Sequence, residues 1–108
     1  MHKSITFMFA GAILLAGSNA YAQKGDAAKG KEVFEQCSVC HNSDSTEVKM
    51  GPGLKGLFKK DKMTSSGKPV TDANILAKIN EGGNGMPSYK DILSDEEKAN
   101  VIAFLKTL

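Results

Sequence analysis

The sequence has no arginine and no tryptophan, and it contains only two cysteines. Proteins that bind nucleic acid usually carry a strong basic excess, with side chains that can read or stack on bases. Here the formal net charge is only +2 over 108 residues. These absences argue against a nucleic-acid partner, and the length favours one small domain rather than several.

A long hydrophobic run is also missing. The apolar run from Ile5 to Ala16 is shorter than the about 20 helical residues that span a bilayer. It follows a basic start and precedes Ala20-Tyr21-Ala22, which places small residues at the −3 and −1 positions of a signal-peptidase site. We therefore expect residues 1–22 to be a cleaved secretory signal peptide. The product, residues 23–108, is expected in the periplasm without stable membrane insertion.

Large side chains are scarce in residues 23–108, where only four aromatic residues remain. A domain this small seldom buries enough apolar surface by itself. It usually needs a disulfide, a metal or a large apolar cofactor as a staple. The composition therefore predicts a covalent or ligand-based staple somewhere in this domain.

Helical patterns are present and a convincing strand pattern is not, which predicts an all-α domain. Asp26 is expected to cap a first helix with one narrow apolar face. That face consists of Ala27, Gly30, Phe34 and Cys37. From Cys37 to Val70 the pattern breaks up into glycine, proline, serine and lysine, which predicts a long loop region. Loops of this kind usually wrap around a ligand.

Two further helices are predicted in the C-terminal half. Thr71 or Asp72 begins the first, and Gly82-Gly83 ends it before a flexible turn that reaches Pro87. Its apolar face holds Ile75, Leu76 and Ile79. Ser94 and Glu97 form a capping box for the last helix. The apolar positions of that helix are Val101, Phe104, Leu105 and Leu108.

The most informative feature is the motif Cys37-Ser38-Val39-Cys40-His41, a C-x-x-C-H pattern typical of c-type haem attachment. Two thiols three residues apart on a helical turn can each add to a vinyl group at one edge of the porphyrin. The imidazole that follows can then reach the iron. A thioredoxin-type redox pair needs a βαβ context, a structural disulfide needs no histidine, and a zinc site needs a fourth soft ligand. The motif therefore favours haem over all three.

The ligand on the other face of the iron is less constrained. Without residues 1–22, His41 is the only histidine, which excludes bis-histidine ligation from one chain. The thioethers of Met50, Met63 and Met86 remain as candidates, together with a lysine, the N-terminus or no ligand at all. Gly85 and Pro87 flank Met86, where glycine allows close approach to a flat ligand and proline fixes the next φ.

Over residues 26–108 the chain resembles a class I cytochrome c of the small bacterial periplasmic type, with one haem. Three segments carry the resemblance: the C-x-x-C-H motif, the glycine-proline loop from Gly51 to Phe58, and Gly85-Met86-Pro87. Gly30 and Phe34, with Val101 and Phe104, are similar to the family's crossing of its terminal helices. The absence of tryptophan is a departure, because in some members a tryptophan bonds a haem propionate.

The resemblance implies a cytochrome c fold, with three or more helices and their loops wrapped around one covalently attached haem c. Cys37 and Cys40 would form the thioethers, and His41 and Met86 would be the axial ligands of the iron. The carbonyl of Pro52 would accept a hydrogen bond from His41. The implied function is one-electron transfer between respiratory or periplasmic redox proteins, not enzymatic catalysis, because both axial positions are filled.

Two other functions stay open at this point. With a labile Met86 the domain would be a haem-based ligand binder or peroxidase-like protein, and the same domain could also be an electron-transfer subunit of a larger dehydrogenase or oxidase. Oligomeric state is open as well, with a monomer or weak oligomer expected. Lysines gather in the loop region and carboxylates before the last helix, either as a dipole that orients redox partners or as solvated surface. They are Lys49, Lys55, Lys59, Lys60, Lys62 and Lys68, against Asp91, Asp95, Glu96 and Glu97.

Overall fold

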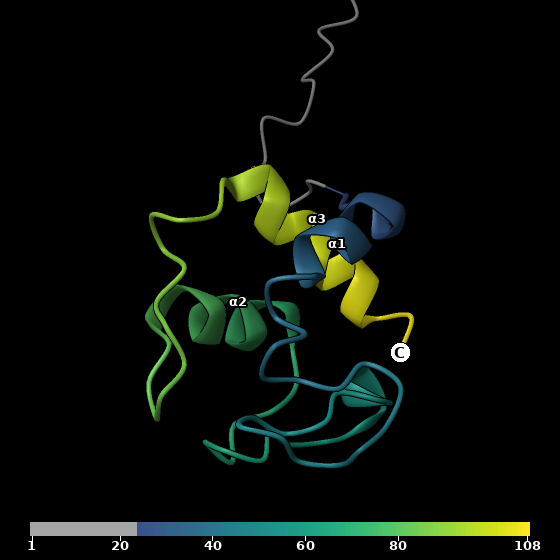
Figure 1. The fold of residues 1–108 in the computed structure, drawn as a ribbon, viewed down its shortest axis with the longest axis vertical. Helices are drawn as coiled ribbons and strands as arrows, with labels where there is room; N and C mark the ends of the chain where they lie inside the picture. The colour runs from purple at the N-terminus through teal and green to yellow at the C-terminus, as the bar shows by residue number, and fades with distance from the viewer. Residues whose placement is uncertain (1–23) are drawn as a thin grey trace, which may run out of the picture.

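A computed structural model describes residues 24–108, and Figure 1 shows their arrangement. The elements are α1 (Ala27–Phe34), the short 3₁₀ helix η2 (Leu57–Lys59), α2 (Asp72–Glu81) and α3 (Asp95–Leu105). Within residues 24–108 the only β-type pairings are isolated bridges, so the prediction of an all-α domain is confirmed. The predicted signal peptide, residues 1–22, lies outside the described residues. No helix within 24–108 has the length and apolar character that crossing a bilayer requires.

The three α-helices begin where their capping residues predict. The Asp26 carboxylate accepts hydrogen bonds from the first turn of α1, and Thr71 does the same for α2 through the amide of Asn74. Ser94 and Glu97 form the expected reciprocal capping box at the start of α3. Gly82, with a φ of 66°, ends α2. These boundaries follow from local side-chain chemistry.

Two helix ends differ from the prediction. The first helix ends at Phe34, so Cys37 lies in the turns that follow α1 and not on its apolar face. There the amide of Cys37 donates a hydrogen bond to the Phe34 carbonyl three residues earlier, and the Ser38 hydroxyl donates one to the Glu35 carbonyl. These bonds replace the regular helical pattern. The last helix likewise ends at Leu105, which leaves Leu108 beyond it, although its side chain still packs against the core.

Helices α1 and α3 cross at close range, as Figure 1 shows. At the crossing, a Cβ added to Gly30 would lie 1.9 Å from the carbonyl oxygen of Asn100, so only glycine fits there. The rings of Phe34 and Phe104 pack beside this point with centroids 5.2 Å apart. The crossing implied by the resemblance is therefore confirmed.

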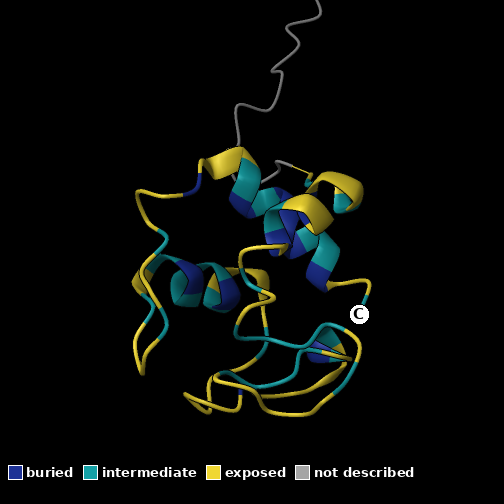
Figure 2. Cartoon of the chain, in the orientation of Figure 1, coloured by how far each residue is buried: buried dark blue, intermediate teal, exposed yellow. Residues whose placement is uncertain are grey.

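The core lies where the helices meet, and most of the loop surface is half-buried or exposed (Figure 2). Buried side chains from α1, η2, α2 and α3 form one cluster with Met63 and Leu93 from the connecting segments. The buried amide of Asn100 ties the two terminal helices further, because its oxygen accepts a hydrogen bond from the backbone of Asp26 at 2.8 Å. This helical frame supports the two long loops that form the site.

Candidate haem site

A cavity of about 300 Å³ lies between the loop that follows α1 and the segment between α2 and α3. In Figure 1 these two stretches of chain, blue to teal and light green, face each other across the molecule. The floor is formed by aliphatic side chains, and the volume falls at the lower end of the usual range for small-molecule sites, about 300 to 1,000 Å³. The aliphatic lining residues are Leu54, Leu57, Ile75, Ile79 and Leu105. The cavity is thus apolar and built from segments far apart in sequence.

Both cysteines line this cavity as free thiols. A chain of short turns brings them there, in which the amides of Cys40 and His41 both bond to the carbonyl of Cys37. Burial raises the pKa of the Cys37 thiol above its ordinary value, and the neighbouring Cys40 raises that pKa further.

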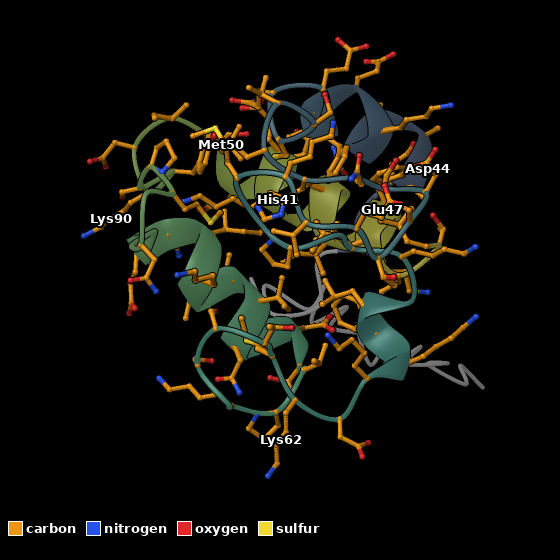
Figure 3. All side chains as sticks on the ribbon, turned by 60° about the horizontal axis from the view of Figure 1, so that its bottom comes forward. His41, Asp44, Glu47, Met50, Lys62 and Lys90 are labelled. Carbon is orange, nitrogen blue, oxygen red and sulfur yellow. The ribbon has the colours of Figure 1, made fainter. Side chains whose placement is uncertain are left out.

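His41 is held in one orientation by its neighbours. Its Nδ1 lies 2.7 Å from the carbonyl oxygen of Pro52. A carbonyl oxygen can only accept, so Nδ1 carries the proton and Nε2 is left as a lone-pair donor. Gly51 packs against the ring, since an added Cβ would lie 2.4 Å from its Cε1 atom. Figure 3 shows the imidazole in the centre of the molecule. This arrangement suits the imidazole as a metal ligand.

All three candidate methionines line the cavity, but their settings differ. Met50 belongs to the same loop as His41, is 79% exposed, and has its Sδ 3.8 Å from the Cys40 Sγ. Met63 is buried in the core, and its sulfur accepts a hydrogen bond from the Ser66 hydroxyl. Met86 is half-buried on the segment across the cavity from the His41 loop. Only Met86 therefore approaches the cavity from a chain segment other than the histidine loop without belonging to the core.

The segment around Met86 has an unusual backbone. Gly82, Gly83, Asn84 and Gly85 all have positive φ values, between 55° and 108°. Glycine adopts such angles without steric cost, which explains the glycine-rich sequence here. The turn closes with paired backbone bonds between Gly83 and Met86. The segment is fastened to α2 where the amide of Tyr89 bonds to Ile79 and the hydroxyl of Ser88 bonds to Asn80.

Two features were not predicted from sequence, one residue that lines the cavity and one that holds the segment after Met86. Tyr89 lines the cavity, and its pKa is raised, first by burial and then by the nearby Cys37 and Cys40. Its place as the only tyrosine in 24–108, three residues after Met86, is the one signal that pointed to it. Lys98 is buried on α3, and its ammonium donates to the backbone carbonyl of Lys90 at 2.9 Å. Helical spacing gave no reason to expect a buried lysine.

These residues fit a covalently attached haem. The cavity is apolar, both free thiols reach it, an oriented imidazole with an available nitrogen donor lies beside it, and a thioether lies on another segment. The close contact of Gly51 with the histidine ring leaves the imidazole little freedom to turn away. Thioether bonds from the cysteines would supply the staple that the composition calls for.

Comparison with known proteins agrees with this chemistry. The cytochrome c family model matches residues 27–108. The cytochrome c2 of Rhodospirillum rubrum is 33% identical over an alignment of 130 residues, which covers 94% of this chain and 96% of that protein. The cytochrome c2 of Blastochloris viridis is 45% identical over 65 residues, covering 59% of this chain and about half, 51%, of its own length. The solved cytochrome c6 of the diatom Phaeodactylum tricornutum superposes with a TM-score of 0.61 at 29% identity, over 77% of this chain and 93% of that one.

The family match covers all four helices and both segments that line the cavity. It gives the chain a covalently bound haem c as its cofactor and electron transfer, not enzymatic catalysis, as its role. Redox proteins are accordingly its class of partner. The chain belongs to the cytochrome c family, as a class I cytochrome with a single haem.

Proposed function

We propose that this cytochrome is a one-electron carrier of the periplasm whose haem c is bound through Cys37 and Cys40, with His41 and Met86 as the axial ligands. One observation carries the proposal: a single apolar cavity brings these four side chains together from two segments about 45 residues apart in sequence. When bound, the haem supplies an iron centre that changes its charge by one electron. The chain supplies the attachment, the two ligands and the apolar surroundings.

The assignment of His41 rests on its hydrogen bond. The Pro52 carbonyl accepts a hydrogen bond from the protonated Nδ1. This bond fixes the tautomer and makes the lone pair of Nε2 a better ligand for a metal. The His41 ring also packs closely against the backbone of Gly51, which restricts its rotation. Nε2 is therefore the nitrogen that would bind the iron.

The assignment of Met86 rests on position. Met50 shares the loop of His41 and lies beside Cys40, so it is poorly placed for the opposite haem face. Met63 belongs to the buried cluster and would leave a hole in the core if it turned to the iron. Methionine sulfur and an apolar pocket both favour ferrous iron, so we expect a comparatively high reduction potential.

Export and partner recognition complete the proposal. The predicted signal peptide would deliver the chain to the compartment where the haem is attached. Its six loop lysines are all exposed, and they lie apart in sequence from Asp91 and from the acidic first turn of α3. Such an asymmetry would orient the protein toward an acidic redox partner and make the association rate fall with salt.

The test is an absorption spectrum of the purified protein, oxidised and reduced, with added pyridine to count thioether bonds. We expect two thioethers and a six-coordinate iron. Met86→Ala should lower the potential, admit carbon monoxide and remove the ferric charge-transfer band of the iron–methionine bond. Met50→Ala and Met63→Ala are the controls and should do none of these. Loss of the band in either control, with Met86→Ala unchanged, would overturn the ligand assignment.

A further inference from the structure

The turn that carries Met86 contains a chemically labile pair of residues. Asn84 is followed directly by Gly85, and of the five asparagines in residues 24–108 only Asn84 precedes a glycine. It is also the only exposed one, because the other four are half-buried or buried. Asparagine is among the thermolabile residues, and a glycine after it leaves the next amide unhindered. The pair is therefore a candidate for a reaction within the chain itself.

That reaction is deamidation through a cyclic imide. The amide nitrogen of Gly85 attacks the side-chain carbonyl carbon of Asn84 and forms a C–N bond. The amide proton and the side-chain NH2 group leave together as ammonia, which gives a succinimide ring. Water then adds to either ring carbonyl and opens the ring, to aspartate or to isoaspartate. One water is consumed for each ammonia released, and nothing is oxidised or reduced.

The structure leaves both reacting groups free. Among residues 24–108, the Gly85 amide donates to no carbonyl or side chain, and the Asn84 side chain makes no hydrogen bond. By contrast, the side-chain amide of Asn42 donates to the Glu47 carbonyl at 3.0 Å. A Cβ added to Gly85 would meet no atom within 4 Å apart from its chain neighbours, so the space beside its amide is open.

The turn that presents this pair is held by few contacts. Asn84 and Gly85, with φ values of 55° and 89°, lie between the mutually bonded Gly83 and Met86, at 2.9 and 3.1 Å. Asparagine followed by glycine suits a two-residue turn with two positive φ values, which explains why the pair stands here. Figure 2 shows the segment after α2 as largely exposed, so little buried surface opposes a local opening that brings the amide to the side chain.

Conversion would change both the charge and the shape of the turn. The Lys78 ammonium on α2 donates to the Gly82 carbonyl at 3.0 Å and lies 3.7 Å from the Cβ position of Gly83. A carboxylate at position 84 would compete with that carbonyl for the ammonium. Isoaspartate would also lengthen the main chain between Gly83 and Met86 by a carbon atom, so their paired bonds would lose register.

We propose that Asn84 is a site of spontaneous deamidation, and that its conversion loosens the segment that carries Met86. The second half rests on the proposed function, because it takes Met86 as a ligand of the iron. The chain is its own substrate, and water is the only co-reactant. A loosened segment holds the sulfur less firmly. An added negative charge favours ferric iron, so conversion should lower the reduction potential.

The first test follows the wild-type holo-protein over time in mildly alkaline buffer, relative to a sample digested at the start. Cleavage after lysine releases residues 79–90 as one peptide, which contains both Asn80 and Asn84. Fragment masses therefore compare a half-buried and an exposed asparagine in the same sample. We expect Asn84 to convert steadily while Asn80 stays intact, with isoaspartate detected at position 84 by enzymatic methylation. Conversion of Asn84 that is no faster than that of Asn80 would overturn the inference.

The second test measures the consequence with two variants. Asn84→Gly keeps a residue that tolerates positive φ but has no side chain to react, and Asn84→Asp carries the new charge on a normal main chain. Aged wild-type protein and fresh Asn84→Asp should lose the ferric charge-transfer band at a lower denaturant concentration than fresh wild type. Asn84→Gly should keep its midpoint on ageing. An unchanged midpoint in both aged wild type and Asn84→Asp would refute the loosening, and so would an equal fall in aged Asn84→Gly.

The two proposals can fail separately. The mass measurement does not depend on which residue binds the iron. If the charge-transfer band survives in Met86→Ala while Asn84 converts, the ligand assignment fails and the deamidation site stands. If the band is lost in Met86→Ala and Asn84 does not convert, only the deamidation site is refuted.

Discussion

The two sides of the cavity are built in different ways. On the histidine side, the loop from Cys40 to Leu54 is closed by its own backbone, through Gly51 to Cys40 at 2.8 Å and Leu54 to Asn42 at 2.7 Å. The His41 ring is then locked by Pro52. On the methionine side, the turn from Gly82 to Pro87 contains only the bonds between Gly83 and Met86, at 2.9 and 3.1 Å. Its other fasteners lie on both sides of the turn. Upstream, the Lys78 ammonium on α2 donates to the Gly82 carbonyl at 3.0 Å, and downstream the contacts are at Ser88, Tyr89 and Lys90.

This difference separates two ways of presenting a ligand. The histidine is oriented by contacts within its own loop, from Gly51 and Pro52. Met86, the proposed second ligand, is positioned by contacts that hold the two ends of its segment to α2 and α3. Segments with few internal hydrogen bonds and little buried apolar surface open at lower free energy than packed helices. We therefore expect the methionine side to open first under stress and the histidine side to stay in place.

The largest effect is expected from removing the haem, which both sides of the cavity would enclose. The double variant Cys37→Ala, Cys40→Ala should lose its haem and stay largely unfolded, because the small core lacks its staple. Circular dichroism and thermal melting measure this. A haem-free double variant with full helix content and cooperative melting would show that the polypeptide core suffices without the cofactor.

The second-largest effect is expected from a substitution that disturbs only the packing around His41. Gly51→Ala places a methyl group 2.4 Å from His41 Cε1, closer than two carbon atoms can approach, so the ring or the loop must shift. We expect a loss of about 1 to 3 kcal/mol in the free energy of unfolding, the usual range for overpacking. Denaturant unfolding of the holo-protein provides the value. Met50→Ala, at the exposed neighbouring residue, is the matched control and should change the stability little.

A more local effect concerns the fastening of the methionine side to α3. Lys98→Met keeps the buried stem but removes the ammonium that holds the Lys90 carbonyl. We expect the proposed iron–Met86 bond to lose about 1.5 to 3 kcal/mol of stability, the range for hydrogen bonds that involve a charged group. The ferric charge-transfer band should then disappear at a lower denaturant concentration, while the helical signal changes less.

Lys90→Met is the control for that experiment. The Lys90 side chain is exposed, and the bond from Lys98 goes to the Lys90 backbone, which the substitution leaves intact. Lys90→Met should therefore behave as the wild type. Equal loss of the band in both variants would mean that charge alone matters and that Lys98 does not fasten the segment.

The smallest effect is expected at Ser88, whose hydroxyl bonds to the Asn80 carbonyl on α2. Ser88→Ala should cost about 0.5 to 1.5 kcal/mol, because the site is exposed and water can replace the hydroxyl. The same denaturant titration of the charge-transfer band measures it. A larger loss than in Lys98→Met would reverse the order of the two fasteners.

Features with local causes were predictable from sequence. The caps Asp26, Thr71 and Ser94 act on amides two or three residues away, so their effect is visible in the chain itself. The haem motif and the glycine-rich turn around Met86 are contiguous for the same reason. The end of α1 at Phe34 was mispredicted because the backbone tightens there into bonds three residues apart, Glu35 to Glu32 and Cys37 to Phe34, which helical spacing does not reveal.

Features that depend on distant partners were not predictable in the same way. Met63 lies among lysines, threonine and serines in sequence, yet folding buries it in the core. Lys98 is buried because its ammonium meets a carbonyl eight residues earlier, on a segment whose path the sequence does not specify.

Proton–carbon NMR of the reduced holo-protein, with methyl-labelled methionine, tests the central claim most directly. A methionine methyl group bound to the iron lies over the porphyrin and takes a strongly upfield, ring-current-shifted resonance. The account predicts one such resonance, absent from Met86→Leu and present in Met50→Leu and Met63→Leu. A shifted resonance that survives Met86→Leu and vanishes in either of the other variants, or the lack of any shifted resonance, would contradict it.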